Sequence, residues 1–201
     1  MNEKVFLENK KSALKKLKKA KDEKLVDEGI LSILDVINQS DDYYTSSSCY
    51  GRIVVLEIPA LGDKKNAKFL GKWHRTIDES EIIDSINKAK IGQIWLLSQS
   101  PIIHITAKSQ NAADKLVKIA VACGFKNSNF KSIEKKIVIE VCSTERLDAP
   151  VGRDGSLFCN DEYLQLLVNI ANEVIEKSTV KLRRFEQKLE KYLSTHKTTK
   201  Q

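Results

Sequence analysis

The order of short apolar segments along the chain is the feature that most constrains its fold. These segments occur in pairs, and a segment with helical periodicity separates each pair from the next. Short links join the two members of a pair, and short links favour antiparallel pairing. We therefore predict an α+β fold of repeated ββα units with flanking helices, not a doubly wound parallel sheet. About six strands are expected, over Gly51–Pro59, Ala67–Arg75, Gln93–Gln99, Pro101–Ala107, Phe125–Lys131 and Lys136–Cys142.

The helical segments are delimited by capping residues. Asn160 is a suitable N-cap for a long C-terminal helix, and Gly124 is placed to end the helix before it. The stretch Ser143–Asn160 shows neither alternation nor helical periodicity and is expected to be irregular. The predicted helices cover the N-terminal segment around Leu14 and Leu17, Asp27–Asn38, Ile77 or Asp78 to Lys90, Ser109–Cys123, and the C-terminal residues from Asp161.

Length and composition fit one folded domain. The chain has 201 residues, of which 41% are hydrophobic and 30% charged, as in globular proteins. No low-complexity linker interrupts it, so we expect a single domain over residues 1–201 with basic helical extensions at both ends. No apolar run approaches the ~20 residues of a membrane span, and the N-terminus lacks the continuous apolar stretch of a secretory signal. We expect a cytoplasmic protein without membrane contact.

Positive charge is concentrated at the two ends of the chain. Residues 1–24 hold nine Lys against four acidic residues, and residues 176–201 hold eight Lys or Arg against three. The formal net charge is +7, so the residues between these segments are slightly acidic. Two Lys-rich helices that lie near each other would form a patch suited to a phosphate backbone. The alternative is a solvated helix surface that only keeps the protein soluble.

Common cofactor motifs are absent from the sequence. The four cysteines form no C-x-x-C pair and have no histidine at ligand spacing, so no metal site is expected. Neither the glycine-rich dinucleotide fingerprint nor a P-loop occurs, which argues against a Rossmann-type site. Free thiols fit a reducing compartment.

One polar segment, Asp42–Arg52, is the strongest candidate for part of an active site, and most of it lies in a predicted loop over Gln39–Gly51. Its run of hydroxyls from Thr45 to Ser48, with free backbone N–H groups, can hold a carboxylate or a phosphate. Arg52 is close enough in sequence to clamp the same anion, and Tyr44 can stack on a base. The alternative is an ordinary serine-rich turn.

Two histidines on predicted strands are candidates for proton transfer. His74 ends one strand and His104 lies within another, and on neighbouring strands they would face one pocket as a base and its orienting partner. On the first of these strands Trp73 points away from His74, whereas Lys72 shares its face. The alternative is a pair of hydrogen-bonded core residues. The third histidine, His196, lies in the basic tail and has no predicted role.

Several motifs occur together and resemble the tRNA wybutosine-synthesizing protein 3 family. They are DYYTSSSCYGR from Asp42, FLGKWH from Phe69, SPIIHI from Ser100, GFKNS from Gly124 and DEYLQLLVNIAN from Asp161. The resemblance covers about Leu25 to Phe185, most of the chain. The family signature Ser-Ser-Cys-x-Gly-Arg is matched by Ser47, Ser48, Cys49, Gly51 and Arg52, with Tyr50 at a variable position where Ser or Ala is expected.

The resemblance implies an enzyme with a defined substrate. The family methylates N(4) of a tricyclic, wyosine-type guanosine derivative next to the anticodon of tRNA(Phe), in the biosynthesis of wybutosine derivatives. Its methyl donor is S-adenosylmethionine, and its fold is unlike the common methyltransferase folds. The implied partner is the anticodon arm of tRNA(Phe), and no obligate protein partner is implied.

The site residues expected from the resemblance fall into three groups. The catalytic residues are His74 and His104, which match family histidines. Residues expected to bind the donor carboxylate or a tRNA phosphate are Ser47, Ser48, Cys49 and Arg52. Residues expected to bind the substrate are Tyr44, Lys72, Trp73, Glu162 and Tyr163, and Asn172 belongs to the same motif as the last two.

Two other functions remain open from the residues alone. The basic ends suit a non-catalytic RNA-binding protein, which would not bind S-adenosylmethionine in the absence of RNA. The Ser/Cys segment suits a phosphate-ester enzyme, although no histidine follows it at a spacing that forces a nucleophile–base pair.

Overall fold

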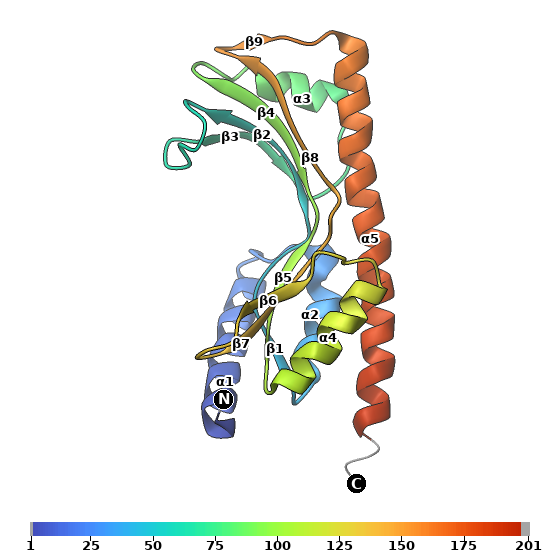
Figure 1. Cartoon of the computed structure of the whole chain (residues 1–201). Helices are drawn as coiled ribbons and strands as arrows, with labels where there is room; N and C mark the ends of the chain where they lie inside the picture. Colours follow the sequence, from blue (N-terminus) through green and yellow to red (C-terminus); the bar gives the residue numbers. More distant parts are fainter. Residues whose placement is uncertain (1, 198–201) are drawn as a thin grey trace. The chain divides into compact units, whose positions relative to one another are not determined.

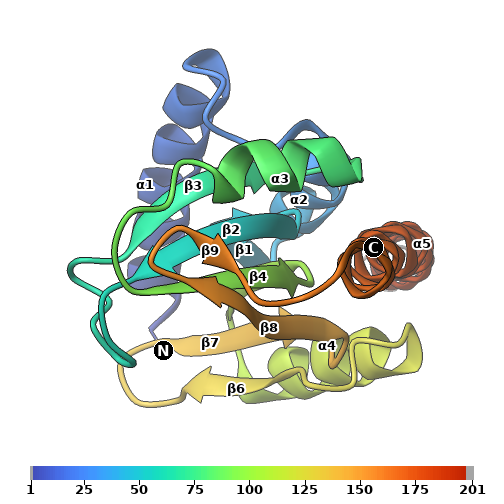
Figure 2. The same ribbon diagram turned by 90° about the horizontal axis from the view of Figure 1, so that it is seen from above.

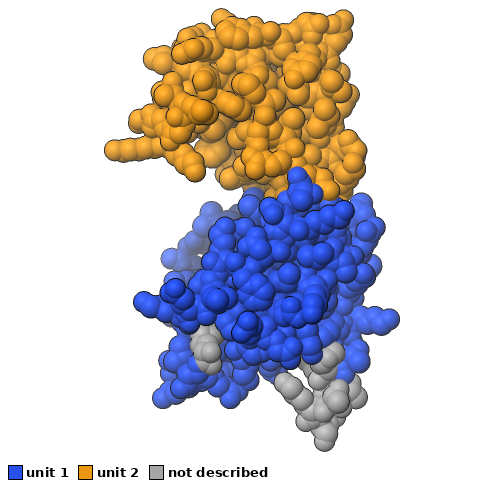
Figure 3. Space-filling view, in the orientation of Figure 1, with its two compact units in different colours: residues 1–50, 101–144, 179–201 blue, residues 51–100, 145–178 orange. Residues whose placement is uncertain are grey.

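The computed structural model describes residues 2–197, apart from the side chains of residues 196 and 197. The end of the basic C-terminal segment, including the side chain of His196, therefore lies outside the described residues. The chain divides into two compact units (Figure 3): unit 1 holds residues 1–50, 101–144 and 179–201, and unit 2 holds residues 51–100 and 145–178. Each unit is assembled from separate stretches of sequence, so no linker composition marks it. The predicted single-domain organisation stays a prediction.

Unit 1 contains a four-stranded antiparallel sheet with the strand order β1-β5-β7-β6. Helix α1 lies along one side of this sheet, and α2 and α4 lie on the other (Figure 1). The elements are α1 (Glu3–Asp22), a 3-10 turn (Glu28–Ile30), α2 (Leu31–Gln39), β1 (Tyr43–Cys49), β5 (Ile102–Ala107), α4 (Gln110–Ala122), β6 (Asn129–Ser132), β7 (Ile137–Cys142) and the last part of α5 (Asp161–Lys197).

One face of the unit 1 sheet packs against helices to form the main apolar core of the unit. Ile103 and Ile105 of β5 point into that core, where the Phe125 and Phe185 rings meet with centroids 5.8 Å apart. On the opposite face Tyr44 packs against Phe6 of α1, with ring centroids 5.2 Å apart. Alternation along the strands thus gives the sheet an apolar face and a mostly polar one.

Unit 2 contains a five-stranded antiparallel sheet with the order β3-β2-β4-β8-β9. Helix α3 runs alongside β3 and β2 (Figure 2), and the first part of α5 covers the same face, where both helices contribute to one buried cluster. The elements are β2 (Arg52–Ile58), β3 (Lys68–Trp73), α3 (Glu79–Ile86), β4 (Gln93–Gln99), β8 (Arg146–Arg153), β9 (Ser156–Leu157) and α5 up to Ser178.

The structure confirms the α+β class, the antiparallel pairing and the long C-terminal helix. All five predicted helices and all six predicted strands are present, with some ends shifted by a few residues. Asn160 caps α5 by accepting the backbone N–H of Tyr163 at 3.0 Å. Gly124 follows α4 with a φ of +102°, a left-handed conformation that glycine adopts without strain. No helix within residues 2–197 is both long and apolar enough to cross a membrane.

The prediction that Gln39–Gly51 is a loop was wrong. Tyr43–Cys49 form strand β1, which pairs with β5 from Tyr43 to Cys49 apart from a bulge at Ser46. The strand was not predicted because its residues are polar. At the buried position Thr45, hydrogen bonds take the place of apolar packing. Thr45 is 6% exposed, and its backbone N–H and hydroxyl bond to the Asn38 amide at 2.9 and 2.8 Å.

The prediction that Ser143–Asn160 is irregular was also wrong, because this stretch forms β8 and β9. Pro150 lies in the middle of β8 and lowers its strand propensity. The register with β4 shifts next to this residue, between Ile94 and Trp95. Such a bulge is where a strand tolerates a missing N–H. With β1, these two strands explain why the described residues form nine strands in two sheets rather than about six.

The start of α3 is held by an ion pair whose strength depends on pH. Arg75 donates two hydrogen bonds to the Glu81 carboxylate, at 2.7 and 3.0 Å, and these lower the pKa of Glu81 from 4.5 to about 2. The same carboxylate accepts the backbone N–H of Asp78. We predict that Glu81→Ala costs about 1 kcal/mol at pH 7, the size of a helix cap.

The pH dependence of this cost follows from the direction of the shift. A lowered pKa stabilises the fold above the unfolded value of 4.5, and this contribution is lost as the pH falls towards 2. Urea denaturation of wild type and Glu81→Ala, at pH 7 and at pH values falling towards 2, measures the difference in their free energies of unfolding. A difference that stays constant across this range would contradict the assignment.

Candidate functional site

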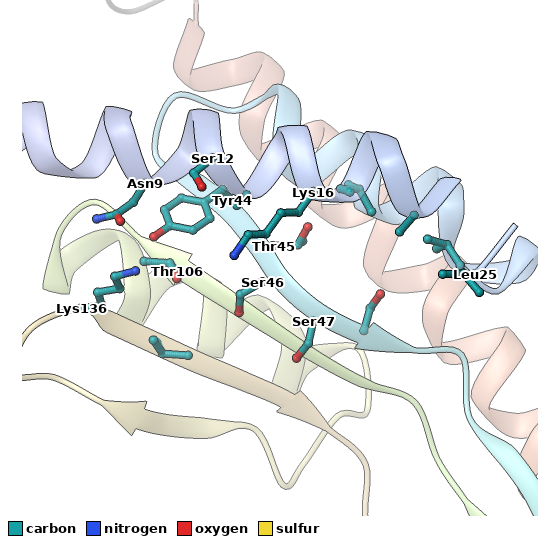
Figure 4. Close-up of a pocket in the computed structure, with 16 residues that line it drawn as sticks. Asn9, Ser12, Lys16, Leu25, Tyr44, Thr45, Ser46, Ser47, Thr106 and Lys136 are labelled. Carbon is teal, nitrogen blue, oxygen red and sulfur yellow. The ribbon is translucent and has the colours of Figure 1, made fainter. Parts of the chain in front are cut away.

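A groove of about 670 Å³ lies in unit 1 between α1 and the polar face of the four-stranded sheet (Figure 4). We define the groove by its lining residues. Its polar wall is formed by Asn9, Ser12, Lys16, Tyr44, Thr45, Ser46, Ser47, Ser48, Thr106 and Lys136, and its apolar wall by Ala13, Leu17, Ala20, Leu25, Val26 and Val138. The volume falls within the range of small-molecule sites.

A β-bulge in β1 decides which hydroxyls face the groove. Thr45 pairs with Ile105 and Ser47 pairs with His104, so Ser46 is the extra residue between them. A bulge reverses the alternation of the residues that follow it. As a result Tyr44 and Ser47, three residues apart, lie on the same face of the sheet, whereas Thr45 is turned towards α2.

Three polar side chains form a hydrogen-bonded row across β1, β5 and β7. Ser47 Oγ lies 2.7 Å from His104 Nδ1, and His104 Nε2 lies 2.8 Å from a carboxylate oxygen of Glu140. The strand registers put these residues directly opposite one another. Because the carboxylate accepts from Nε2, neutral His104 leaves Nδ1 free to accept the proton of the Ser47 hydroxyl.

The Glu140 carboxylate is held in its charged form. Burial works to raise its pKa, but hydrogen bonds from His104 and Lys131 outweigh burial and hold the pKa below its ordinary value. Lys131 Nζ lies 3.2 Å from the carboxylate. A charged carboxylate behind the imidazole stabilises the imidazolium that forms when His104 takes a proton. The row therefore has the arrangement of a hydroxyl, a base and an orienting acid.

Tyr44 contributes a buried hydroxyl with unused hydrogen-bonding capacity. The residue is 2% exposed, and its hydroxyl has no hydrogen-bond partner in the described structure. Figure 4 shows this hydroxyl pointing into the groove, on the side where Asn9 and Lys136 lie. A buried hydroxyl without a partner costs free energy, so its position favours a polar ligand atom or a water molecule.

Two lysines give the groove a positive potential. Lys16 extends from α1 towards the serines of β1, and Lys136 stands beside Thr106 at the edge of β7 (Figure 4). Neither forms an ion pair with a carboxylate in the part of the chain that the structure describes. With the serine hydroxyls, they provide donors for a carboxylate or a phosphate.

The other signature residues of unit 1 lie at the end of β1. Ser48 lines the groove, and Cys49 is half-buried and paired with Ile102. Tyr50 does not line it: its hydroxyl lies 2.6 Å from the Thr179 hydroxyl, and its backbone N–H donates to Asp27 at 2.8 Å. Tyr50 thus ties the end of β1 to neighbouring parts of unit 1.

Several predicted site residues belong to unit 2. Arg52 donates to the Gln99 side chain at 2.9 Å, and its guanidinium lies 5.7 Å from the centre of the Phe69 ring. Lys72 is exposed on β3, whereas Trp73 is half-buried against the unit 2 core. His74 follows directly after the end of β3.

The predicted motif that begins at Asp161 lies in α5, and two of its residues hold neighbouring segments by hydrogen bonds. Glu162 accepts a hydrogen bond from the Asn160 amide at 2.7 Å, and Tyr163 is 48% exposed. Asn172 both donates to and accepts from the backbone of Ile77, at 2.8 and 2.9 Å. This pair of bonds fixes the segment before α3 to the helix.

The structure thus brings together part of the predicted site. Tyr44, Ser47 and Ser48 line one groove, and His104 is bonded to Ser47. The predicted pairing of His74 with His104 stays a prediction, because these residues belong to different units. Sequence reasoning missed Glu140, Lys16 and Lys136. An acidic residue alternating with apolar ones in IVIEVC was the available signal for Glu140.

Tyr43 and Tyr44 provide a matched test of the groove. Tyr43 points into the core and donates to the Ala112 carbonyl at 2.8 Å, whereas the Tyr44 hydroxyl has no hydrogen-bond partner among the described residues. We predict that Tyr44→Phe leaves the free energy of unfolding unchanged or raises it by roughly 1 kcal/mol. Tyr43→Phe should lower it by about 0.5–1.5 kcal/mol, because the hydrogen bond from the Tyr43 hydroxyl to the Ala112 carbonyl is lost. Thermal denaturation measures both, and a Tyr44→Phe loss as large as that of Tyr43→Phe would contradict the assignment.

The family model described as Methyltransferase TYW3 matches residues 8–191 of the chain. A protein of Thermococcus sibiricus named "tRNA(Phe) 7-((3-amino-3-carboxypropyl)-4-demethylwyosine(37)-N(4))-methyltransferase" is 46% identical over 190 residues, which are 94% of this chain and 96% of that protein. A protein of Pyrococcus horikoshii with the same name, numbered 1, is 48% identical over 189 residues, 92% of this chain and 96% of that protein.

Solved structures show the same fold. The PH1069 protein of Pyrococcus horikoshii superposes with a TM-score of 0.90 and 47% identity, over 93% of this chain and 97% of that chain. A hypothetical protein of Aeropyrum pernix superposes with a TM-score of 0.72 and 28% identity, over 82% and 98%.

Proposed function

The chain belongs to the Methyltransferase TYW3 family, and from that premise we propose that it methylates N(4) of 7-(3-amino-3-carboxypropyl)-4-demethylwyosine, next to the anticodon of tRNA(Phe). The relatives reported above carry this activity in their names. The observation on this chain that best supports the proposal is the groove floored by the signature strand, where Ser47 is bonded to His104. We also propose a cytoplasmic location and chemistry without a metal.

The groove fits S-adenosylmethionine as methyl donor. Its apolar wall suits the adenine ring and the methylene groups, and its serines with Lys16 and Lys136 suit the carboxylate. The buried Tyr44 hydroxyl offers a further polar contact. When bound, this donor supplies an activated methyl group whose bonding electron pair stays with sulfur.

The Ser47–His104–Glu140 row provides a path for the proton that the substrate nitrogen loses. Ser47 accepts this proton as its own hydroxyl proton passes to His104 Nδ1, 2.7 Å away. Glu140, 2.8 Å from Nε2, stabilises the resulting imidazolium. His74 is the second candidate for proton transfer. Lysines of α1 are proposed to bind the RNA backbone, and so is Arg52 of unit 2.

Mass spectrometry of the RNA product tests the activity directly. The protein is incubated with S-adenosylmethionine and tRNA(Phe) that carries the demethylated tricyclic base, and the expected result is one added methyl group on that base. Calorimetry with the donor alone separates an enzyme from a pure RNA-binding protein, since only the enzyme binds the donor without RNA. Donor binding without methyl transfer would contradict the proposed substrate.

A substitution at His104, the middle residue of the Ser47–His104–Glu140 row, separates the methyl-transfer step from donor binding. We predict that His104→Gln lowers the rate of methyl transfer by about 10²- to 10⁴-fold, the usual contribution of a general base. The Kd for the donor should change little, because His104 does not line the groove. Single-turnover rates and calorimetry provide the two readouts. Ser32→Ala, an exposed serine of α2, is the control. A wild-type rate in His104→Gln would remove the row from the mechanism.

Arg52 and His74, the predicted site residues of unit 2, provide a separate test. If they act as predicted, Arg52→Ala weakens tRNA binding and His74→Ala slows methyl transfer, as shown by titration with tRNA and by single-turnover kinetics. Wild-type behaviour of both variants would contradict their place in the site.

A further inference from the structure

The five-stranded sheet of unit 2 has one face that carries no helix. Residues 51–100 and 145–178 are all described, and within them α3 and α5 pack on the face that holds Ile53, Val55 and Leu96. Figure 1 shows both helices on that side of the sheet. We call the opposite side the open face. Strand alternation and register place on it Arg52, Leu56, Phe69, Lys72, Trp95 and Leu97.

Two aromatic rings of the open face lie in one cross-strand row. Phe69 on β3 pairs with Leu56 on β2, and Leu56 pairs with Trp95 on β4. Two strand spacings separate the rings by about 10 Å, so each can take a different planar group. Phe69 is 58% exposed and Trp95 is half-buried, so both rings offer surface to a ligand.

A β-bulge brings a cation onto the same face. The pairing of β2 with β3 shifts between Val55 and Leu56, so Leu70 is an extra residue and packs against the helical side. Phe69 and Lys72 therefore share the open face, although residues three apart normally point to opposite faces. Arg52 completes the group, with its guanidinium 5.7 Å from the centre of the Phe69 ring.

Charge is unequally distributed between the two sides of unit 2. Its helical layer, α3 with the preceding Asp78 and α5 up to Ser178, carries eight acidic residues and one basic residue. On the open face, neither Arg52 nor Lys72 has an ion-pair partner among the described residues. Two cations without a carboxylate partner among the described residues, beside one exposed and one half-buried ring, match a chain that carries phosphates and unstacked bases.

We propose that the open face of unit 2 binds single-stranded RNA, with separate bases stacked on Phe69 and Trp95 and with phosphates held by Arg52 and Lys72. This surface deepens the proposed function and rests on it for the identity of the RNA, the anticodon loop of tRNA(Phe). The loop's unpaired bases can be splayed onto a sheet, whereas a duplex keeps its bases stacked. A purely apolar protein partner would leave the two cations without a counter-charge.

Tryptophan fluorescence reports directly on the proposed stacking. The chain has two tryptophans, so Trp73→Phe leaves Trp95 as the only one. We expect an unmodified RNA hairpin with the anticodon-loop sequence of tRNA(Phe) to quench the emission of this variant, and a blunt RNA duplex not to quench it. Equal quenching by hairpin and duplex, or quenching by neither, would overturn the stacking assignment.

Affinity measurements test the energetic part of the proposal. By fluorescence anisotropy with labelled hairpin, Phe69→Ala and Trp95→Ala should each weaken binding at least about fivefold. Lys72→Met should weaken binding and reduce its salt dependence. Leu166→Ala removes an apolar side chain that is 50% exposed on the helical layer, and it should bind like wild type. Circular dichroism confirms that each variant is folded.

The results of these experiments distinguish a failure of the proposed RNA surface from a failure of the proposed methyltransferase function. If wild type methylates tRNA(Phe) but both aromatic variants bind the hairpin normally, the open face is not the RNA surface and the methyltransferase assignment stands. If the aromatic variants lose RNA binding but wild type transfers no methyl group, the surface stands and the reaction is wrong. If Leu166→Ala weakens binding as much as Phe69→Ala, the effect is not specific to the face and the proposal fails.

Discussion

The pairing of β1 with β5 is the interaction on which the candidate site depends. It places the signature serines in a sheet rather than in a loop, and the bulge at Ser46 sets which of them face the groove. One residue of slip would move Ser47 away from His104 and break the row with Glu140, because every side chain would change faces. The backbone ladder and the Asn38–Thr45 hydrogen bonds hold this register. The chemistry of the site is therefore fixed by main-chain geometry.

Both sheets follow one plan in how their two faces are used. Each packs one face against helices and leaves the other face polar or aromatic. In unit 1 the second face is covered by α1, and the space between them becomes a groove with two lysines. In unit 2 the second face carries no helix of that unit. An antiparallel sheet permits this arrangement because alternate residues belong to opposite faces.

Sequence reasoning found the elements more readily than the strand partners. Apolar alternation located β4 and β5, and capping residues located α4 and α5. It missed β1 because Thr45 is buried with hydrogen bonds instead of apolar contacts. It missed β8 because Pro150 breaks the expected strand pattern. It identified Ser47 and His104 as candidates but not Glu140, whose position opposite His104 depends on a register that no local pattern encodes.

The sequence alone determined the α+β class, the family resemblance, and the signature residues from Ser47 to Arg52. These follow from residue types and short spacings, which are local properties. Only the tertiary structure decided that Ser47 shares a face with Tyr44 and that Phe69 shares a face with Lys72. Two single-residue bulges are responsible, and a bulge is set by pairing with a strand distant in the sequence. The chain thus specifies its chemical groups locally, whereas long-range hydrogen bonding decides which of them meet.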